Sequence, residues 1–228
     1  MAEEAEHPVY SRVFPAASKL DAYGMAFDDL AVFEAAGHSR ESIGQLATYG
    51  FVTYGGMRTL LTSIAEHSPF SKAEGGEKVA GDSASSCLSR LSDLRFLDLG
   101  SGDGRAVIAA ALLVPGLVEA VGVELSVLRH ELAVKRWNGL PEDVRSHVTF
   151  LQDDVFQLQA DFLATVDVVW LANLRFPDEA VERLNSKLEA ECGVKADVVI
   201  ATLRKCDFAR PHTMWTEQVA MSWNPDGW

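Results

Sequence analysis

Hydrophobic residues beyond position 94 fall into short runs rich in β-branched side chains, and these runs alternate with stretches of helical spacing. Apolar runs of about four to eight residues are typical of strands, whereas apolar positions three and four apart mark one face of a helix. This alternation predicts right-handed crossovers and a doubly wound, mostly parallel α/β sheet. The expected strands cover residues 95–99, 118–123, 148–151, 166–172 and 196–203, and the expected helices cover 106–113, 127–137 and 179–191.

Residues 1–70 have a helical pattern instead. Apolar side chains recur at three- and four-residue spacing from Leu20 onward, and Gly37 can end that helix. A second helix is expected to begin at Thr53, whose hydroxyl can cap it, and to run to Pro69. We therefore expect an N-terminal helical region ahead of the sheet.

Small polar residues without apolar periodicity follow, from Ser71 to Ser89. Such a stretch cannot bury enough apolar surface to offset the entropy lost on ordering. Residues 71–93 are therefore expected to be a flexible linker, and residues 94–228 to form the main domain.

The formal net charge of −13 narrows the range of partners. A strongly acidic surface repels phosphate backbones, so we expect no strong direct nucleic-acid binding and favour a basic protein as substrate. The three cysteines fit neither a disulfide framework nor a zinc site, and we predict no metal. Without a signal peptide or an apolar run near the roughly 20 residues that span a bilayer, the protein is expected to be soluble and intracellular, with no membrane partner.

A glycine-rich turn, Gly-Ser-Gly-Asp-Gly, joins the first expected strand to the next helix. Asp98 lies near the end of that strand, and Gly100, Gly102 and Gly104 let the backbone pass close to a ligand. The helix start adds free N–H groups and a partial positive charge. The spacing G-x-G-x-G differs from the G-x-G-x-x-G of dinucleotide-binding folds.

Carboxylates also follow the next two expected strands. Glu124 ends the second strand and can accept hydrogen bonds from both hydroxyls of a ribose, while Asp154, Val155 and Phe156 follow the third and can contact an adenine. Ligands of such sheets bind outside the carboxyl ends of the strands. The three elements therefore predict one site for a nucleoside ligand.

These motifs resemble those of the class I S-adenosylmethionine-dependent methyltransferases, over about residues 94–203. The resemblance implies a Rossmann-like domain over residues 94–228, with S-adenosylmethionine as cofactor. It implies that Gly100, Gly102 and Gly104 line the cofactor's amino-acid end, with Asp98 near its ammonium group, that Glu124 holds the ribose, and that Asp154 with Val155 or Phe156 holds the adenine.

Three further segments resemble the disruptor-of-telomeric-silencing family, which are histone lysine methyltransferases without the SET fold. Residues 49–57 look like that family's loop before the core, 168–176 like its fourth-strand motif, and 221–223 like the start of its final strand. This implies methyl transfer to a protein lysine, with a histone or nucleosome as partner, and a nuclear rather than cytoplasmic location. It also implies cofactor contacts from Tyr49, Thr53 and Asn173, and a catalytic site in which Asn173 orients the acceptor while Phe176 and Tyr54 wall the lysine channel.

The chain departs from this family at several positions. Phe51 replaces an acidic residue of the loop, Ala172 replaces an asparagine, and an aromatic residue expected farther along the last strand is missing. Trp170 either packs in the core or joins the channel wall. Two alternatives therefore stay open: a methyltransferase of a non-histone protein or small molecule, and a catalytically silent module that only binds the cofactor.

Overall fold

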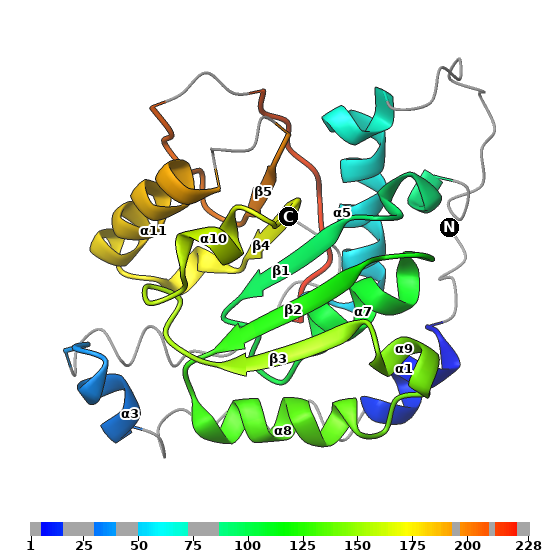
Figure 1. Ribbon diagram of the computed structural model, residues 1–228, viewed down its shortest axis with the longest axis horizontal. Coiled ribbons are helices and arrows are strands. Elements are labelled where there is room, and N and C mark those ends of the chain that lie inside the picture. Colours follow the sequence, from blue (N-terminus) through cyan, green and yellow to red (C-terminus); the bar gives the residue numbers. More distant parts are fainter. Residues whose placement is uncertain are drawn as a thin grey trace.

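The computed structural model describes residues 6–15, 30–39, 50–72, 87–192, 197–209 and 213–222. Its centre is a five-stranded, all-parallel sheet in the order β3-β2-β1-β4-β5 (Figure 1). The strand order reverses between β1 and β4, which makes the sheet doubly wound and Rossmann-like and confirms the predicted fold class. The strands are β1 (Arg95–Leu99), β2 (Glu119–Glu124), β3 (Val148–Gln152), β4 (Val168–Leu171) and β5 (Val199–Thr202).

Helical segments join successive strands and cover both faces of the sheet. The segments that follow β1 and β2 pack on one face, and those that follow β3 and β4 pack on the other. This arrangement is what right-handed crossovers produce on the two sides of a switch in strand order. The segments are α7 (Arg105–Leu113), α8 (Val127–Trp137), α9 (Glu142–Arg145), α10 (Ala160–Leu163), η4 (Asn173–Arg175) and α11 (Asp178–Glu191).

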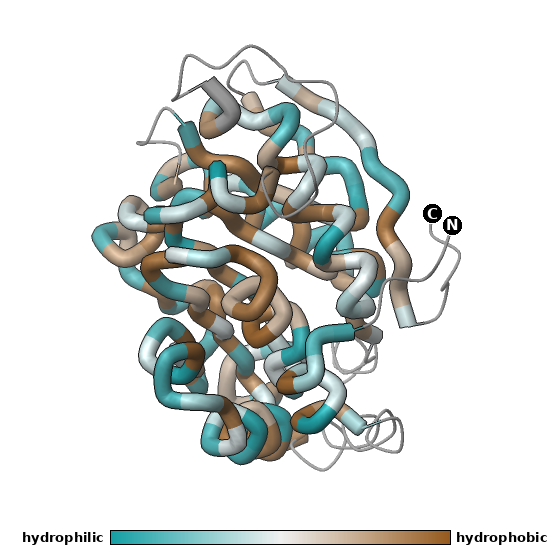
Figure 2. The backbone as a smooth tube through the Cα atoms, turned by 90° about the vertical axis from the view of Figure 1, so that its right-hand side faces the viewer, coloured by the Kyte–Doolittle hydropathy of each residue, from teal (hydrophilic) through white to brown (hydrophobic). Residues whose placement is uncertain are grey.

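Both faces of the sheet are buried in apolar side chains. Phe96 and Val168 point to the face covered by α7, whereas their neighbours Leu97 and Val169 point to the opposite face and pack near Leu184 of α11. Figure 2 shows the apolar stretches of the chain gathered in the interior. Strands buried on both faces are near-continuously hydrophobic, which is why these runs could be found in the sequence.

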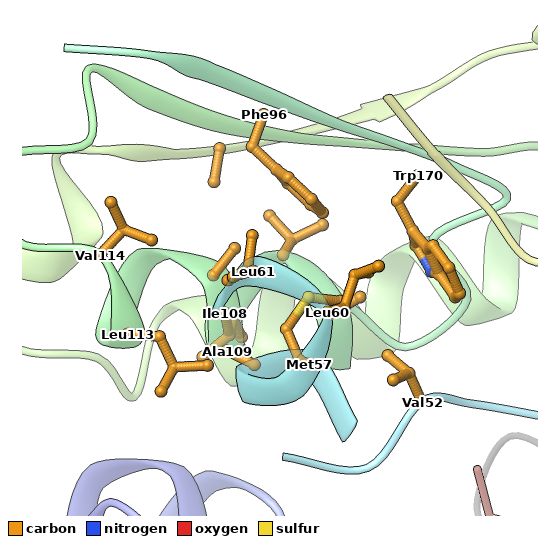
Figure 3. Packing of buried hydrophobic residues seen from close by; sticks show 14 of the residues in the cluster. Val52, Met57, Leu60, Leu61, Phe96, Ile108, Ala109, Leu113, Val114 and Trp170 are labelled. Carbon is orange, nitrogen blue, oxygen red and sulfur yellow. The ribbon is translucent and has the colours of Figure 1, made fainter. Parts of the chain in front are cut away.

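The N-terminal helices α1 (Pro8–Val13) and α5 (Tyr54–His67) share a hydrophobic cluster with the sheet. Figure 3 shows Met57 and Leu61 of α5 facing Ile108 of α7, with Phe96 of the sheet above them. The N-terminal region therefore contributes to the same core as the main domain.

Two predicted helix boundaries in this region are confirmed. Thr53 caps α5, and its Oγ1 accepts a hydrogen bond from the N–H of Gly56 at 3.0 Å. Helix α3 (Leu30–Ala35) is followed by Gly37, whose φ of 87° is the left-handed conformation that commonly ends helices.

Short 3₁₀ turns, η2 (Pro69–Lys72) and η3 (Ser89–Leu91), flank most of the expected linker. Tyr49 and residues 73–86 lie outside the described residues. At the expected start of a final strand, Met221 makes an isolated antiparallel bridge to Val52, and Trp223 lies outside the described residues. The 213–222 segment, drawn in red, runs beside the cyan helix α5 (Figure 1).

Candidate functional site

A pocket lies at the carboxyl ends of the central strands, where a doubly wound sheet binds its ligands. The pre-core loop, the glycine turn and the segments after β2, β3 and β4 all contribute to it. Eight of the predicted site residues line this pocket together: Asp98, Gly100, Gly102, Glu124, Asp154, Val155, Phe156 and Phe176.

The glycine turn takes a backbone course that only glycine adopts without strain. Gly100, Gly102 and Gly104 all have positive φ, at 84°, 54° and 85°. The N–H groups of Gly100 and Ser101 both donate to the carbonyl of Val123 at 2.9 Å, which ties the turn to β2. The first two glycines therefore present their backbone to the pocket.

Gly104 has a different role, since it does not line the pocket. It precedes α7, and a Cβ built on it would lie 2.6 Å from Cζ of Phe150 on β3. Only glycine allows the start of α7 to pack this closely on the sheet.

Glu124 is buried at the end of β2, and both of its carboxylate oxygens accept backbone hydrogen bonds. Oε2 accepts from the N–H of Gly102 at 2.8 Å, and Oε1 accepts from the N–H of Ser126 at 2.9 Å. A carboxylate oxygen has two lone-pair sites, so each can accept one more hydrogen bond. Glu124 thus offers a fixed pair of acceptors on the pocket wall.

Asp98 is 3% exposed, and no hydrogen bond or ion pair reaches its carboxylate from the described residues. Burial, with the nearby charges of Glu124 and Asp103 adding to it, raises the pKa of Asp98 well above its ordinary value of 3.8. A buried carboxylate without a partner is costly, and a ligand's cationic group would relieve that cost. Asp98 therefore marks a position suited to an ammonium group.

The segment after β3 lines the pocket with Asp154, Val155 and Phe156. Oδ1 of Asp154 accepts the N–H of Phe156 at 2.9 Å, which fixes this turn. The guanidinium of Arg183 lies over the Phe156 ring, 3.9 Å from its centroid. An acceptor oxygen and an apolar surface are thus placed side by side, an arrangement that suits a heterocyclic base.

Aromatic side chains form the remaining wall of the pocket: Phe51, Trp170 and Phe176 all line it. Phe176 stands opposite the glycine turn, because a Cβ built on Gly100 would lie 3.8 Å from its Cζ. Trp170 is 3% exposed, so it packs in the core cluster and also lines the pocket.

Three other predicted site residues lie off the pocket. Asn173 is fully buried, and its Oδ1 accepts the N–H of Arg204 at 2.8 Å. Tyr54 packs against Tyr10, with ring centroids 4.7 Å apart, and burial raises the pKa of Tyr54 to about 12. Thr53 is engaged in capping α5.

Several pocket residues were not predicted from the sequence. Phe33 and His38 reach the pocket from α3 and the turn after it, and Arg129 comes from α8. Asp103 and Arg105 line it beside the glycine turn and form an ion pair in which Arg105 Nε lies 3.0 Å from Asp103 Oδ2. The position of this oppositely charged pair at the start of the apolar helix α7 was the available signal.

Within the described part of the chain, no group of three or more His, Cys, Asp or Glu side chains could hold a metal ion. No helix among those residues is long and apolar enough to cross a membrane.

No family model and no curated protein matches this sequence. Solved structures match parts of it. The glycopeptide N-methyltransferase MtfA is 22% identical over 42% of this chain and 44% of its own, with a TM-score of 0.36. A SAM-dependent methyltransferase from Thiobacillus denitrificans, in complex with S-adenosyl-L-homocysteine, is 31% identical over 37% of this chain and 32% of its own, with a TM-score of 0.30.

The methyltransferase domain of a bacterial Hen1 is 14% identical over 60% of this chain and 61% of its own, with a TM-score of 0.42. This chain thus spans less than two thirds of the length of each of these three structures. The overlaps concern part of the fold.

Proposed function

We propose that this protein binds S-adenosylmethionine and transfers its methyl group to an acceptor. The observation that carries the proposal is the convergence of Asp98, the glycine turn and Glu124 on one pocket. The carboxylate of Asp98, which has no partner among the described residues, fits the cofactor's ammonium group, and the two oxygens of Glu124 fit the hydroxyls of its ribose. Asp154 and Phe156 would hold the adenine.

When bound, the cofactor supplies a methyl group on a sulfonium centre, which is already electrophilic. The protein's own residues then have to orient the acceptor and exclude water. Phe51, Trp170 and Phe176 offer an apolar, aromatic wall for this purpose. Such a wall attracts cationic groups by cation–π interaction, and desolvation lowers the pKa of an amine so that its lone pair becomes available.

The acceptor that best suits this pocket and surface is a lysine ε-amine on a basic protein. The net charge of −13 favours association with a basic partner, and a long aliphatic stem ending in an amine suits an aromatic channel. Histones are one candidate among such proteins. Asn173 and Tyr54, on which the histone resemblance partly depends, lie off the pocket, so the proposal does not rest on that family.

A small-molecule acceptor is the second candidate, and one observation favours it. Phe33 and His38 bring the N-terminal region to the pocket wall, on the side where Phe156 also lies. Side chains from this region narrow the space available to a macromolecule.

Labelling experiments distinguish these acceptors. The protein is incubated with tritiated S-adenosylmethionine and either core histones, nucleosomes or histones whose lysines have been blocked by chemical acetylation. Label recovered on lysine in unblocked histones alone supports the lysine proposal. Label on a small molecule from a metabolite extract supports the second candidate. Tight cofactor binding without label on any acceptor contradicts both and favours a silent binding module.

A further inference from the structure

The 213–222 segment contacts helix α5 through Trp215 and Ala220. The indole N–H of Trp215 donates to Oγ of Ser63 at 2.9 Å, and its ring stacks on His67 with centroids 5.8 Å apart. A Cβ built on Gly56 would lie 2.1 Å from the carbonyl oxygen of Ala220. The segment therefore passes so close to the first turn of α5 that only glycine fits there.

The end of this segment pairs with the loop that lines the pocket. The N–H of Thr53 donates to the carbonyl of Ala220 at 3.1 Å, and the N–H of Ser222 donates to the carbonyl of Phe51 at 2.8 Å. The N–H of Phe51 in turn donates to Oγ of Ser222 at 3.1 Å. Both backbone polar groups of Phe51 are thus held by Ser222.

Phe51 links this pairing to the glycine turn. Its ring lines the pocket, and the guanidinium carbon of Arg105 lies 4.3 Å from the ring centroid. Arg105 is buried and ion-paired with Asp103, which lies between Gly102 and Gly104. A continuous set of contacts therefore runs from Ser222 through Phe51 and Arg105 to the turn.

We propose that the 213–222 segment positions Phe51 in the pocket wall and is needed for tight binding in that pocket. This inference rests on the proposed function, since S-adenosylhomocysteine, the product form of the cofactor, is the probe. Without the segment, the loop would lose its hydrogen-bond partners and Phe51 its fixed place over Arg105. Ser222 and Ala220 are positioning residues that act through the loop.

Two adjacent glycines of α5 provide a matched test. Gly56→Ala drives a methyl group into the carbonyl of Ala220, whereas a Cβ on Gly55 would meet nothing within 4 Å. By calorimetry on the folded proteins, Gly55→Ala should bind S-adenosylhomocysteine like wild type. Gly56→Ala should bind about tenfold more weakly, because a small misplacement of a binding group is costly. Leu188→Ala, which opens the core on the opposite face of the sheet, controls for destabilisation alone and should bind like wild type.

If Gly56→Ala does not fold, a second pair of variants tests whether the 213–222 segment supports binding. Ser222→Ala removes the acceptor of the Phe51 N–H and should weaken binding about threefold, whereas Ser222→Thr keeps the hydroxyl and should restore it. Wild-type affinity in Ser222→Ala, or in a folded Gly56→Ala, would overturn the inference. If wild type itself does not bind the probe, the proposed function has failed instead.

Discussion

The N–H of Gly102 donates to Oε2 of Glu124 at 2.8 Å, which joins the middle of the glycine turn to the end of β2. The second oxygen of Glu124 accepts from Ser126, at the start of α8. The carboxylate is therefore oriented by the fold itself, and its remaining acceptor sites are fixed on the pocket wall. A pre-organised acceptor of this kind binds hydroxyl groups without a further entropic cost of ordering.

Asp98 is expected to lower the stability of the folded protein and to increase its affinity for S-adenosylmethionine. Asp98→Asn removes a buried carboxyl group that has no partner among the described residues, and should raise the free energy of unfolding by about 1 kcal/mol at about pH 8. The same change should weaken S-adenosylmethionine binding at least about tenfold, since it removes the partner of the ammonium group. Denaturant unfolding and calorimetric titration measure the two effects. Loss of stability in Asp98→Asn would contradict this account.

The stabilising effect of Asp98→Asn should depend on pH. The pKa of Asp98 is raised in the folded state above its ordinary 3.8, so the folded protein binds the proton more tightly than the unfolded chain. Asp98 therefore contributes stability that is fully present below its ordinary pKa of 3.8 and is lost as the pH rises through its raised pKa in the folded protein. The advantage of Asp98→Asn over wild type should therefore be larger at about pH 8 than at about pH 4. An advantage that shrinks with rising pH would contradict the assignment.

Alanine substitutions at Gly104 and Gly37 distinguish the energetic cost of a steric clash from the cost of a left-handed backbone. Both have positive φ, but a Cβ on Gly104 would lie 2.6 Å from Cζ of Phe150, whereas one on Gly37 would meet nothing within 4 Å. Gly37→Ala should cost about 1–2 kcal/mol from the left-handed backbone alone. Gly104→Ala should cost about 1–3 kcal/mol more, because the start of α7 must move away from β3. Equal losses of unfolding free energy in the two variants would show that the Phe150 side chain moves aside without an energetic cost.

Asn173 should contribute to stability and not to cofactor affinity. Its Oδ1 accepts a hydrogen bond from the N–H of Arg204. Asn173→Ala removes this bond and should lower the free energy of unfolding by about 1 kcal/mol. S-adenosylhomocysteine affinity should stay within about twofold of wild type, because the residue does not line the pocket. Phe176→Ala, which does change the pocket wall, is the positive control. A large loss of affinity in Asn173→Ala would instead assign a ligand to its Nδ2, which is buried and has no partner among the described residues.

The sheet and the centre of the pocket could be predicted because both follow from short-range sequence patterns. Strands buried on two faces give continuous apolar runs, and the expected run at 95–99 coincides with β1. The residues at the carboxyl ends of β1, β2 and β3 must then meet at one edge of the sheet. Asp98, Glu124 and Asp154 could thus be placed together from their positions at the carboxyl ends of three successive strands.

The contributions of Phe51, Phe33 and His38 to the pocket could not be predicted in the same way. Packing between segments that lie far apart in the sequence brings these side chains to the pocket. Tyr54 and Phe51 lie three positions apart, yet Tyr54 packs on Tyr10 while Phe51 reaches the pocket. What distinguishes them is the pairing of Phe51 with Ser222, far away in the sequence. Phe33 and His38 likewise enter the pocket by the packing of α3, which no local pattern specifies.

The central claim is that the pocket binds S-adenosylmethionine through Glu124, and calorimetric titration tests it most directly. Wild type should bind S-adenosylmethionine saturably and should not bind NAD. Glu124→Ala should bind the methyl donor more weakly by about 1–3 kcal/mol, the effect of losing a charged acceptor. Circular dichroism of the variant ensures that a folded protein is compared. Absence of binding by wild type, or undiminished binding by a folded Glu124→Ala, would contradict the account.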